Sequence, residues 1–372
     1  MSDALDLHLS TAHQELYEST RALAAGPLKH LTEQGTPGTV NRPLIAGLAE
    51  HGLLPRLFTG DQVPATDLCL IREALARHCT EAETAFALQG LGAYPILQAG
   101  SSELIQRWIP AVAGGAAVAA FALTEPEAGS DVAALALIAA PDPQTHGHRL
   151  TGRKLWISNA PDADIYTVFA RAPEGITAFA VPGDSPGLTG QGKIMLAPHA
   201  IGSLEFDGVA VPPEHRLGAP GAGFQVAMRT LDLFRPSVGA FAIGMARAAL
   251  DLAVQRARER QAFGRPLSAN QAVSHRLAEL AARTQAARLL VHQAAAAHDA
   301  GRPDRALAAM AKLLATETAQ AAVDAAVQVH GAAGLEHGHP LEHLYREVRA
   351  PRIYEGASEI QREIIARSLF GR

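Results

Sequence analysis

A chain of 372 residues with 48% hydrophobic residues can bury more than one core, so we expect two or three structural units. The net charge of -5, with cations scattered among acids, argues against a nucleic-acid-binding surface. Two cysteines, Cys69 and Cys79, are too few for a disulfide framework and favour a reducing compartment. The start resembles no signal peptide and no later run predicts a membrane span, so we expect a soluble cytoplasmic protein.

Residues 1–115 have a helical pattern and predict an N-terminal α-helical domain. Apolar residues recur there at three- and four-residue steps between Gly and Pro, at Leu16, Leu23, Leu44, Leu48, Leu68, Ile71, Leu75 and Ala82. Pro95 predicts a break in one helix, and Pro110 predicts the end of the next.

Residues 116–218 change to short β-branched or aromatic runs separated by turns, which predicts a middle β domain. The expected strands are Ala117–Leu123, Arg149–Ile157, Ile165–Ala170, Ile176–Val181, Ile201–Phe206 and Val209–Val211. Their spacing suits a small antiparallel β-barrel or sandwich. The residues from Pro141 to Gly147 are expected to form a turn.

The stretch Phe121–Asp131 lies where the helical character gives way to alternation. Its strand breaks at Pro126 and Gly129, which exposes backbone N–H groups and the hydroxyls of Thr124 and Ser130. The residues alone leave two interpretations open, a ligand-binding loop and a plain exit from a strand.

Residues 219–372 return to long amphipathic helices and predict a C-terminal four-helix bundle. One expected apolar stripe consists of Val273, Leu277, Leu280, Thr284, Ala287 and Val291. A second, between Pro303 and Gly331, consists of Leu307, Met310, Leu314, Ala321 and Val327. The fold class expected is therefore α+β and multidomain.

Three segments in order carry a resemblance to a known family. They read Phe-Ala-Leu-Thr-Glu-Pro-Glu-Ala-Gly-Ser-Asp from Phe121, Gly-Arg-Lys-Leu-Trp-Ile-Ser-Asn-Ala from Gly152, and Ile-Tyr-Glu-Gly-Ala-Ser-Glu-Ile from Ile353. The chain from about Gly100 onward resembles the acyl-CoA dehydrogenases, which are FAD-dependent flavoproteins. The resemblance implies the α,β-dehydrogenation of an acyl thioester to its trans-2-enoyl product, with flavin N5 accepting the β-hydride.

Glu355 matches the catalytic base of that family, which takes the α-proton. Enclosure beside an apolar acyl chain would raise the pKa of this carboxyl toward the working pH, and the Glu355 N–H would hold the thioester oxygen. Some relatives carry the base on an earlier helix. The matching window, Leu231–Gly239, offers Asp232 but no glutamate, which supports Glu355.

The resemblance also implies binding residues. Thr124 and Ser158 match hydroxyls on the flavin ring, Trp156 matches an aromatic beside it, and Arg260 matches a contact to the FAD pyrophosphate of a neighbouring subunit. The full set expected for FAD is Phe121, Leu123, Thr124, Gly129, Ser130, Trp156, Ile157, Ser158, Arg260, Ala262, Phe263, Gln271, Gln328, Val329, Gly331, Ala332, Ala357 and Glu359. The set expected for the acyl-CoA substrate is Ser130, Asp232, Arg235, Gly356 and Arg367.

The family pattern further implies a homotetramer, a dimer of dimers, that passes electrons to an electron-transferring flavoprotein in fatty acid metabolism. Three alternatives stay open, namely an acyl-carrier-protein dehydrogenase, a flavin oxygenase and a DNA-associated relative. No metal is expected, because His330, His337, His339 and His343 are irregularly spaced and no cysteine or ordered acid joins them. Ala332 stands where the family usually has a second glycine, which predicts weaker FAD binding.

Overall fold

The computed structural model describes residues 9–60 and 63–371, which divide into two compact units. The bundle unit comprises Met1–Gly26, Ala65–Glu83 and Asp232–Arg372, and the sheet unit comprises Pro27–Pro64 and Thr84–Leu231. The predicted boundaries of three domains, at residues 115 and 218, stay a prediction. Residues 1–8 and 61–62 of the predicted N-terminal domain lie outside the described residues.

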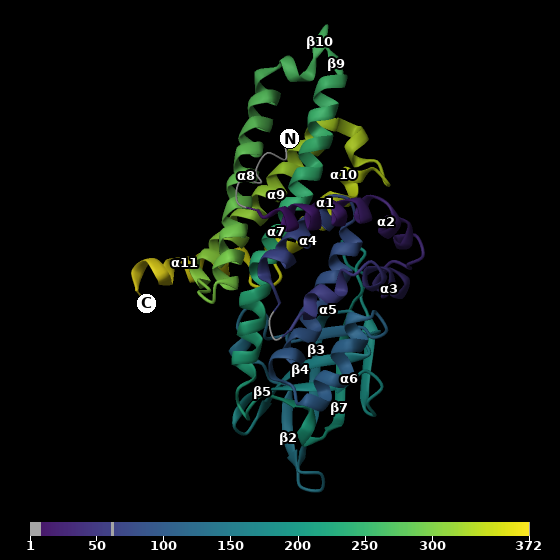
Figure 1. The fold of residues 1–372 in the computed structure, drawn as a ribbon, viewed down its shortest axis with the longest axis vertical. Helices are drawn as coiled ribbons and strands as arrows, with labels where there is room; N and C mark the ends of the chain where they lie inside the picture. Colours follow the sequence, from purple (N-terminus) through teal and green to yellow (C-terminus); the bar gives the residue numbers. More distant parts are fainter. Residues whose placement is uncertain (1–8, 61–62, 372) are drawn as a thin grey trace. The chain divides into compact units, whose positions relative to one another are not determined.

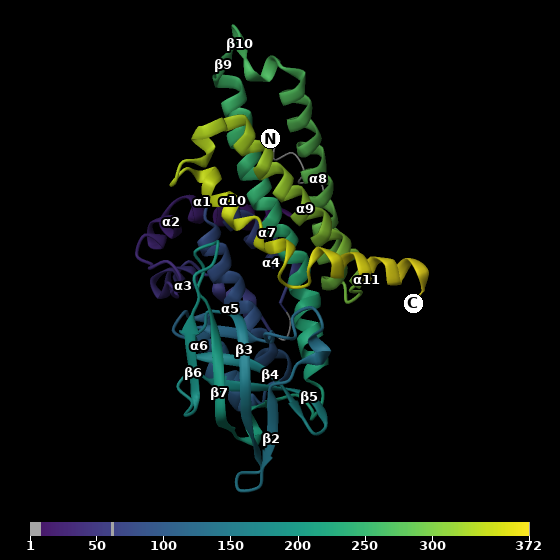
Figure 2. The same cartoon turned by 180° about the vertical axis from the view of Figure 1, so that it is seen from behind.

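The bundle unit is helical, as the sequence predicted for the C-terminal region (Figures 1 and 2). Its helices are α1 (Thr11–Ala25), α4 (Ala65–Ala76), the larger part of α7 (Gly223–Glu259), α8 (Gln271–Asp299), α9 (Arg305–His330), α10 (Pro340–Glu347) and α11 (Ser358–Phe370). The strands β9 (Gln261–Ala262) and β10 (Arg265–Pro266) form a hairpin between α7 and α8. Both views place this hairpin at the opposite end of α8 from α11.

Helix α9 has well-defined ends and a face that is buried in the bundle unit. It begins after Asp304, whose carboxylate accepts hydrogen bonds from the N–H groups of Ala306 and Leu307, and it ends at Gly331, whose φ of +65° suits glycine. Its most buried face consists largely of alanines, while the bulky stripe expected from the sequence, Leu307 and its companions, is only partly buried. The stripe predicted on α8, in contrast, is buried from Leu277 to Val291.

Small residues allow the long helices to approach closely. A Cβ added at Gly239 of α7 would lie 2.7 Å from Cγ2 of Val291 on α8 and 3.4 Å from the Ala315 side chain on α9. Three helices therefore meet at one point without room for a methyl group.

A buried ion network holds α4 against α7 and α8. Glu73 is fully buried, and its carboxylate accepts hydrogen bonds from Arg247 at 2.7 Å and from Arg288 at 2.9 Å. Two guanidinium groups offset the cost of burying this carboxylate and hold its pKa well below the usual range, despite burial. Arg72, the residue before Glu73 on α4, is held separately, since its guanidinium donates to the Glu83 carboxylate and to the Ser237 hydroxyl.

The sheet unit contains one eight-stranded sheet and several helices. The helices are α2 (Pro27–Thr32), α3 (Arg42–Glu50), most of α5 (Thr80–Ala99) and α6 (Ser102–Ala113). The strands are β1 (Ala119–Ala122), β2 (Ile138–Asp142), β3 (Gly147–Ser158), β4 (Ile165–Ala172), β5 (Gly175–Pro182), β6 (Leu188–Gly192), β7 (Ile201–Val211) and β8 (Arg216–Leu217). Their order is β6-β7-β3-β2-β4-β5-β8, with β1 beside β4. The predicted fold class is confirmed, but the sheet is mixed, because β1 and β2 pair with β4 in parallel.

The strand predictions were incomplete. Strands β2, β6 and β8 were not predicted, and Pro141, expected in a turn, lies within β2. The two segments expected after Ile201 form one strand, since a bulge at Asp207 and Gly208 continues the pairing of β7 with β3.

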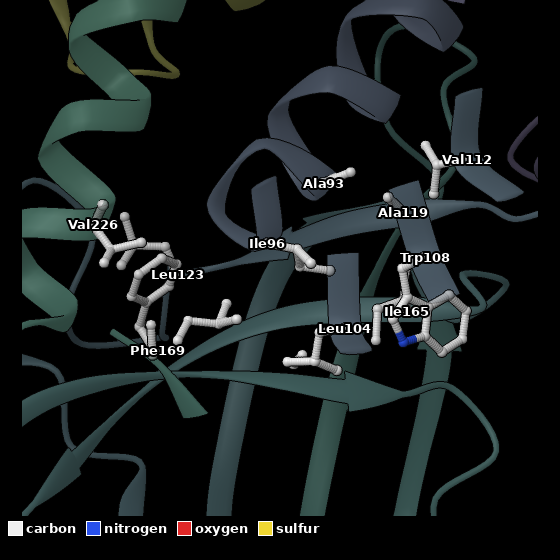
Figure 3. Packing of buried hydrophobic residues seen from close by; sticks show 14 of the residues in the cluster. Ala93, Ile96, Leu104, Trp108, Val112, Ala119, Leu123, Ile165, Phe169 and Val226 are labelled. Carbon is white, nitrogen blue, oxygen red and sulfur yellow. The ribbon is translucent and has the colours of Figure 1, made fainter. Parts of the chain in front are cut away.

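The predicted effects of two prolines were wrong. Pro95 lies inside α5 and Pro110 lies inside α6, and neither helix ends there. Residues close to both prolines in sequence belong to the core of the sheet unit, and Figure 3 shows two of them, Ile96 and Val112. Burial of Ile96 and Val112 against Ala119 and the other core residues outweighs the hydrogen bond that each proline removes.

One helix in the described chain, α7, is long and apolar enough to cross a membrane by length and composition alone. Of its most apolar window, 78% is buried inside the structure, as in the core helix of a folded domain.

Candidate functional site

The loop after β1 is a closed turn. The N–H and C=O groups of Glu125 and Ala128 bond to each other across Pro126 and Glu127. The Thr124 carbonyl accepts a hydrogen bond of 3.0 Å from the Leu155 N–H, which ties the loop to β3. These hydrogen bonds therefore hold the loop predicted from the sequence in one conformation.

A buried lysine of β3, Lys154, stabilises this loop through hydrogen bonds. Nζ of Lys154 donates to the Leu123 carbonyl at 2.9 Å and to Oε1 of Glu125 at 2.8 Å, and the lysine is 0% exposed. The Glu125 carboxylate also accepts from the N–H groups of Ala136 and Leu137. Burial lowers the pKa of Lys154 to about 8, although Glu125 opposes the shift.

Trp156 is presented outward by a bulge at the end of β3. The pairing of β3 with β7 shifts register between Lys154 and Ile157, and Trp156 adopts a left-handed φ of +54°. Its side chain is 50% exposed, unusual for an indole, whereas Ile157 beside it is buried. The strained bulge therefore aims an aromatic face away from the core.

Two hydroxyls belong to the segments next to the tryptophan. Ser158 ends β3 two residues after Trp156, and the carbonyl of Thr124 bonds to Leu155, the residue before it. Within the described part of the chain, neither Oγ1 of Thr124 nor Oγ of Ser158 has a hydrogen-bond partner, and both residues are partly exposed. Gly129 and Ser130 are exposed on the same loop. Three other predicted residues have their side chains in or against the core, so any contact from them to a ligand is made mainly by their main chain; they are Phe121, Leu123 and Ile157.

In the bundle unit, the turn before α11 holds Glu355 in an unusual backbone conformation. Glu355 and Gly356 have consecutive left-handed φ values of +51° and +94°. The φ of Gly356 favours glycine, and a Cβ there would also displace Nε2 of Gln361, which lies 2.6 Å from its position. Oε2 of Glu355 is buried without a hydrogen-bond partner among the described residues, which also include no acceptor for its N–H.

Burial raises the pKa of the Glu355 carboxyl, and three cations limit the rise. These are Arg72 from α4, Lys312 from α9 and Arg235 from α7. A carboxylate with a raised pKa and a free oxygen is suited to accept a proton.

Asp232, the other candidate for the base, is fully paired. Its two oxygens bind Arg235 at 2.8 Å and Arg305 at 3.0 Å. Arg235 also approaches the Glu355 carbonyl at 3.4 Å, which brings two predicted substrate residues to the Glu355 turn. Arg367 lies on the exposed part of α11 and pairs with Glu363.

The remaining predicted FAD residues lie elsewhere in the bundle unit. Arg260 and Gln271 are exposed on either side of the β9–β10 hairpin, and at its tip Phe263 is 99% exposed with a φ of +53°. Helix α8 has 29 residues and is therefore about 43 Å long, and α11 lies toward the end of α8 that is opposite this hairpin. Gln328, Gly331 and Ala332 are exposed where α9 ends, Val329 there is partly buried, and Ala357 and Glu359 lie at the start of α11.

Family models match nearly the whole chain. The matches are to the acyl-CoA dehydrogenase N-terminal domain over residues 10–116, the middle domain over 120–209 and the C-terminal domain over 221–370. The chain belongs to the acyl-CoA dehydrogenase family.

Individual acyl-CoA dehydrogenases agree with this assignment. The cyclohexane-1-carbonyl-CoA dehydrogenase of Geobacter metallireducens is 36% identical over 345 residues, which cover 89% of this chain and 90% of the relative. The structure of butyryl-CoA dehydrogenase from Megasphaera elsdenii superposes with a TM-score of 0.91 at 32% identity, covering 98% of this chain and 100% of that one. A glutaryl-CoA dehydrogenase from Mycobacterium smegmatis in complex with FADH2 gives 0.92 at 25% identity, with coverage of 99% and 97%.

As an acyl-CoA dehydrogenase, the protein is an FAD-dependent oxidoreductase that dehydrogenates acyl-CoA. The sheet unit fits this cofactor. An outward indole supplies an apolar face, and the free hydroxyls of Thr124 and Ser158 supply donors for a polar ring edge.

Sequence reasoning missed the buried charged residues that support these acyl-CoA dehydrogenase elements. Lys154 and Lys312 are both 0% exposed, and each donates to backbone carbonyls of a predicted site loop. The signal was present for Lys312, since it lies three and four residues from Ala315 and Ala308 on the buried face of α9. Among residues 9–60 and 63–371, no group of three His, Cys, Asp or Glu residues is arranged to hold a metal ion.

Proposed function

We propose that Glu355 is the base that removes the α-proton of an acyl-CoA, giving the trans-2-enoyl product. The single observation that carries this proposal is the buried Oε2 of Glu355, which has no hydrogen-bond partner among the described residues. An unsatisfied buried carboxylate oxygen is costly unless a substrate group meets it.

The charges around Glu355 suit this role. Burial raises its pKa, so the carboxylate is a stronger base than an exposed glutamate, while Arg72, Lys312 and Arg235 oppose this rise. Asp232 is a poor alternative, because both of its oxygens are held by arginines.

The backbone at Glu355 supports a second role, the binding of the thioester carbonyl oxygen. The left-handed turn leaves the Glu355 N–H without an acceptor among the described residues. A hydrogen bond from this N–H would stabilise the negative charge that develops on the carbonyl oxygen as the α-proton leaves. Arg235 and Gly356 would line the same end of the substrate, with Asp232 holding Arg235.

FAD, when bound, accepts the hydride from the substrate Cβ. We propose that Trp156 packs against its ring system and that Thr124 and Ser158 donate to its polar edge, with Gly129 and Ser130 on the same loop toward FAD or the pantetheine arm. Arg260, Ala262, Phe263, Gln271, Gln328, Val329, Gly331 and Ala332 would contact the FAD of a neighbouring subunit, because the hairpin lies at the far end of α8 from α11. Ala357 and Glu359 would contact FAD beside the Glu355 turn, and Arg367 the substrate.

We propose that the protein is a homotetramer that acts in the cytoplasm with an electron-transferring flavoprotein as electron acceptor. One exposed residue supports the oligomer. Phe263 exposes almost its entire side chain at the hairpin tip. An exposed aromatic on a strained turn is suited to burial against a second copy of the chain.

The test is reduction of the bound FAD by substrate without oxygen. The FAD-loaded protein is titrated with butyryl-, isobutyryl-, cyclohexanecarbonyl-, octanoyl- and palmitoyl-CoA while the flavin absorbance is recorded. We expect bleaching with at least one of these thioesters, and none with Glu355→Gln, which keeps the shape of the side chain but cannot accept the proton.

Two results would count against the proposal. If Glu355→Gln bleached as fast as the wild type, another residue would be the base. If no CoA thioester bleached the flavin but an acyl-carrier protein did, the substrate class would be wrong while the base could be retested with that donor.

A further inference from the structure

The turn that carries Glu355 is fastened to α9 by one buried lysine. Nζ of Lys312 donates to the Tyr354 carbonyl at 3.0 Å and to the Gly356 carbonyl at 2.6 Å, so its two hydrogen bonds bracket Glu355. Lys312 is 0% exposed and lies on the buried face of α9. No other described side chain bonds to the carbonyls on both sides of Glu355.

The same helix holds the turn at a second point. Glu317, five residues after Lys312, accepts a hydrogen bond of 2.6 Å from the Ser358 hydroxyl and pairs with Arg352 at 2.9 Å. Gln361 of α11 adds a bond of 2.8 Å to the Gly356 carbonyl. The segment from Arg352 to Ser358 is therefore attached to α9 before, within and after the left-handed turn.

We infer that Lys312 is a positioning residue for the reaction, and that Glu317 assists it by fixing the end of the same turn. This inference rests on the proposed role of Glu355 as the base. Its physical content is that two consecutive left-handed residues form a strained backbone, which keeps one conformation only when its surroundings hold it. Without Lys312, the Glu355 carboxylate and N–H would lose their fixed position relative to the thioester.

A lysine at this position adds a charge as well as donors. A buried ammonium costs free energy that a neutral donor would not, so the charge itself requires a reason. Lys312 faces Glu355 and Arg235, together with Glu317 of α9 and Glu359 of α11. Burial lowers the pKa of Lys312 to about 8, which leaves the group protonated at neutral pH. Its charge, with those of Arg72 and Arg235, opposes the rise in the pKa of Glu355.

The chain provides a matched control in its other buried lysine. Lys154 is also 0% exposed, also donates to a backbone carbonyl and also has its pKa lowered to about 8. It braces the loop of Thr124 in the sheet unit and is absent from the charges that act on Glu355. A general effect of removing a buried lysine should appear in both variants, and a positioning effect on Glu355 should appear only at Lys312.

The experiment compares Lys312→Met, Lys154→Met and Glu317→Gln in the FAD-loaded enzyme. For Lys312→Met we expect kcat to fall about 100-fold with KM little changed, the cost of a small displacement of a reacting group. The acidic limb of the pH profile of kcat/KM should move to higher pH, because one cation that lowers the pKa of Glu355 is gone. Glu317→Gln should lower kcat without raising that limb, and Lys154→Met should leave it in place.

A second measurement does not depend on activity. Hydrogen–deuterium exchange read by mass spectrometry should speed up in the peptide covering residues 350–361 of Lys312→Met, while peptides of α7 and α8 keep the wild-type rate. If Lys312→Met does not fold, Lys312→Gln replaces it, since its amide can keep one of the two bonds but not the charge, so the acidic limb should still move.

The outcomes separate this inference from the proposed function. If Lys312→Met kept the wild-type activity and the wild-type acidic limb of kcat/KM, the positioning role would be overturned. Faster hydrogen exchange throughout the bundle unit would also overturn it, because that result would mean that Lys312 only stabilises the fold. Full turnover by Glu355→Gln would instead overturn the assignment of the base, whatever Lys312 does, while selective exchange in residues 350–361 would still report the attachment.

Discussion

The pair of Lys154 and Glu125 offers the sharpest test of how the sheet unit supports its loop. Replacing Lys154 with methionine removes the donor to the Leu123 carbonyl and leaves a buried carboxylate without its cation. Breaking a buried ion pair from one side costs about 3–5 kcal/mol. Glu125 would still accept hydrogen bonds from the N–H groups of Ala136 and Leu137. We therefore expect Lys154→Met to lower the free energy of unfolding by the smaller of these values, about 3 kcal/mol.

Guanidinium chloride unfolding of wild type, Lys154→Met, Glu125→Gln and the double variant measures this cost. The double variant should be more stable than the sum of the single losses predicts, because removing both charges leaves neither one unpaired. A loss below about 1 kcal/mol for Lys154→Met would match a solvent-exposed pair and refute the reasoning. Additive losses would also refute it, since they would mean that the two side chains do not interact.

Four further predictions concern the cofactor and the base. Trp156→Ala should weaken FAD binding about 30-fold by fluorescence titration, the equivalent of about 2 kcal/mol of lost aromatic burial; an unchanged affinity would exclude stacking on this indole. Phe263→Asp should shift the protein to a smaller species in analytical ultracentrifugation and release FAD without changing the circular dichroism, and an unchanged mass would place the hairpin tip outside the interface. Ala332→Gly should tighten FAD binding by removing one methyl group, whereas weaker binding would contradict the predicted role of this position. The wild-type kcat/KM should fall with decreasing pH at a midpoint above the ordinary value for glutamate, about 4.3, because burial raises the pKa of Glu355 and only its ionised form accepts a proton; a midpoint at or below that value would argue that the base is exposed.

The sequence predicted those elements in which side-chain pattern and local propensity agree. The stripe from Leu277 to Val291 on α8 is buried as expected, and α9 ends at Gly331 as expected. The outline of the candidate site stays a prediction, which rests on the three segments that carry the family resemblance and lie in family order along the chain.

Other features depend on tertiary contacts that no local pattern contains. Pro95 and Pro110 end helices by propensity, yet burial of their neighbours keeps α5 and α6 continuous. Strand β6, with four exposed residues out of five, lacks the alternation that marks a strand. Lys154 and Lys312 look like surface residues by type, and only the folded chain shows the carbonyl groups that each one satisfies.

The alanine face of α9 also determines which parts of this enzyme can vary. At Gly239 the helices α7, α8 and α9 leave no space for a methyl group, and Lys312 lies on the same crowded face. A larger side chain at Ala315 would therefore shift α9, the helix whose Lys312 bonds to the carbonyls on both sides of Glu355. Some variants of the bundle interior should therefore fold and bind FAD but turn over slowly. Changes in substrate preference should arise from residues outside the alanine face of α9.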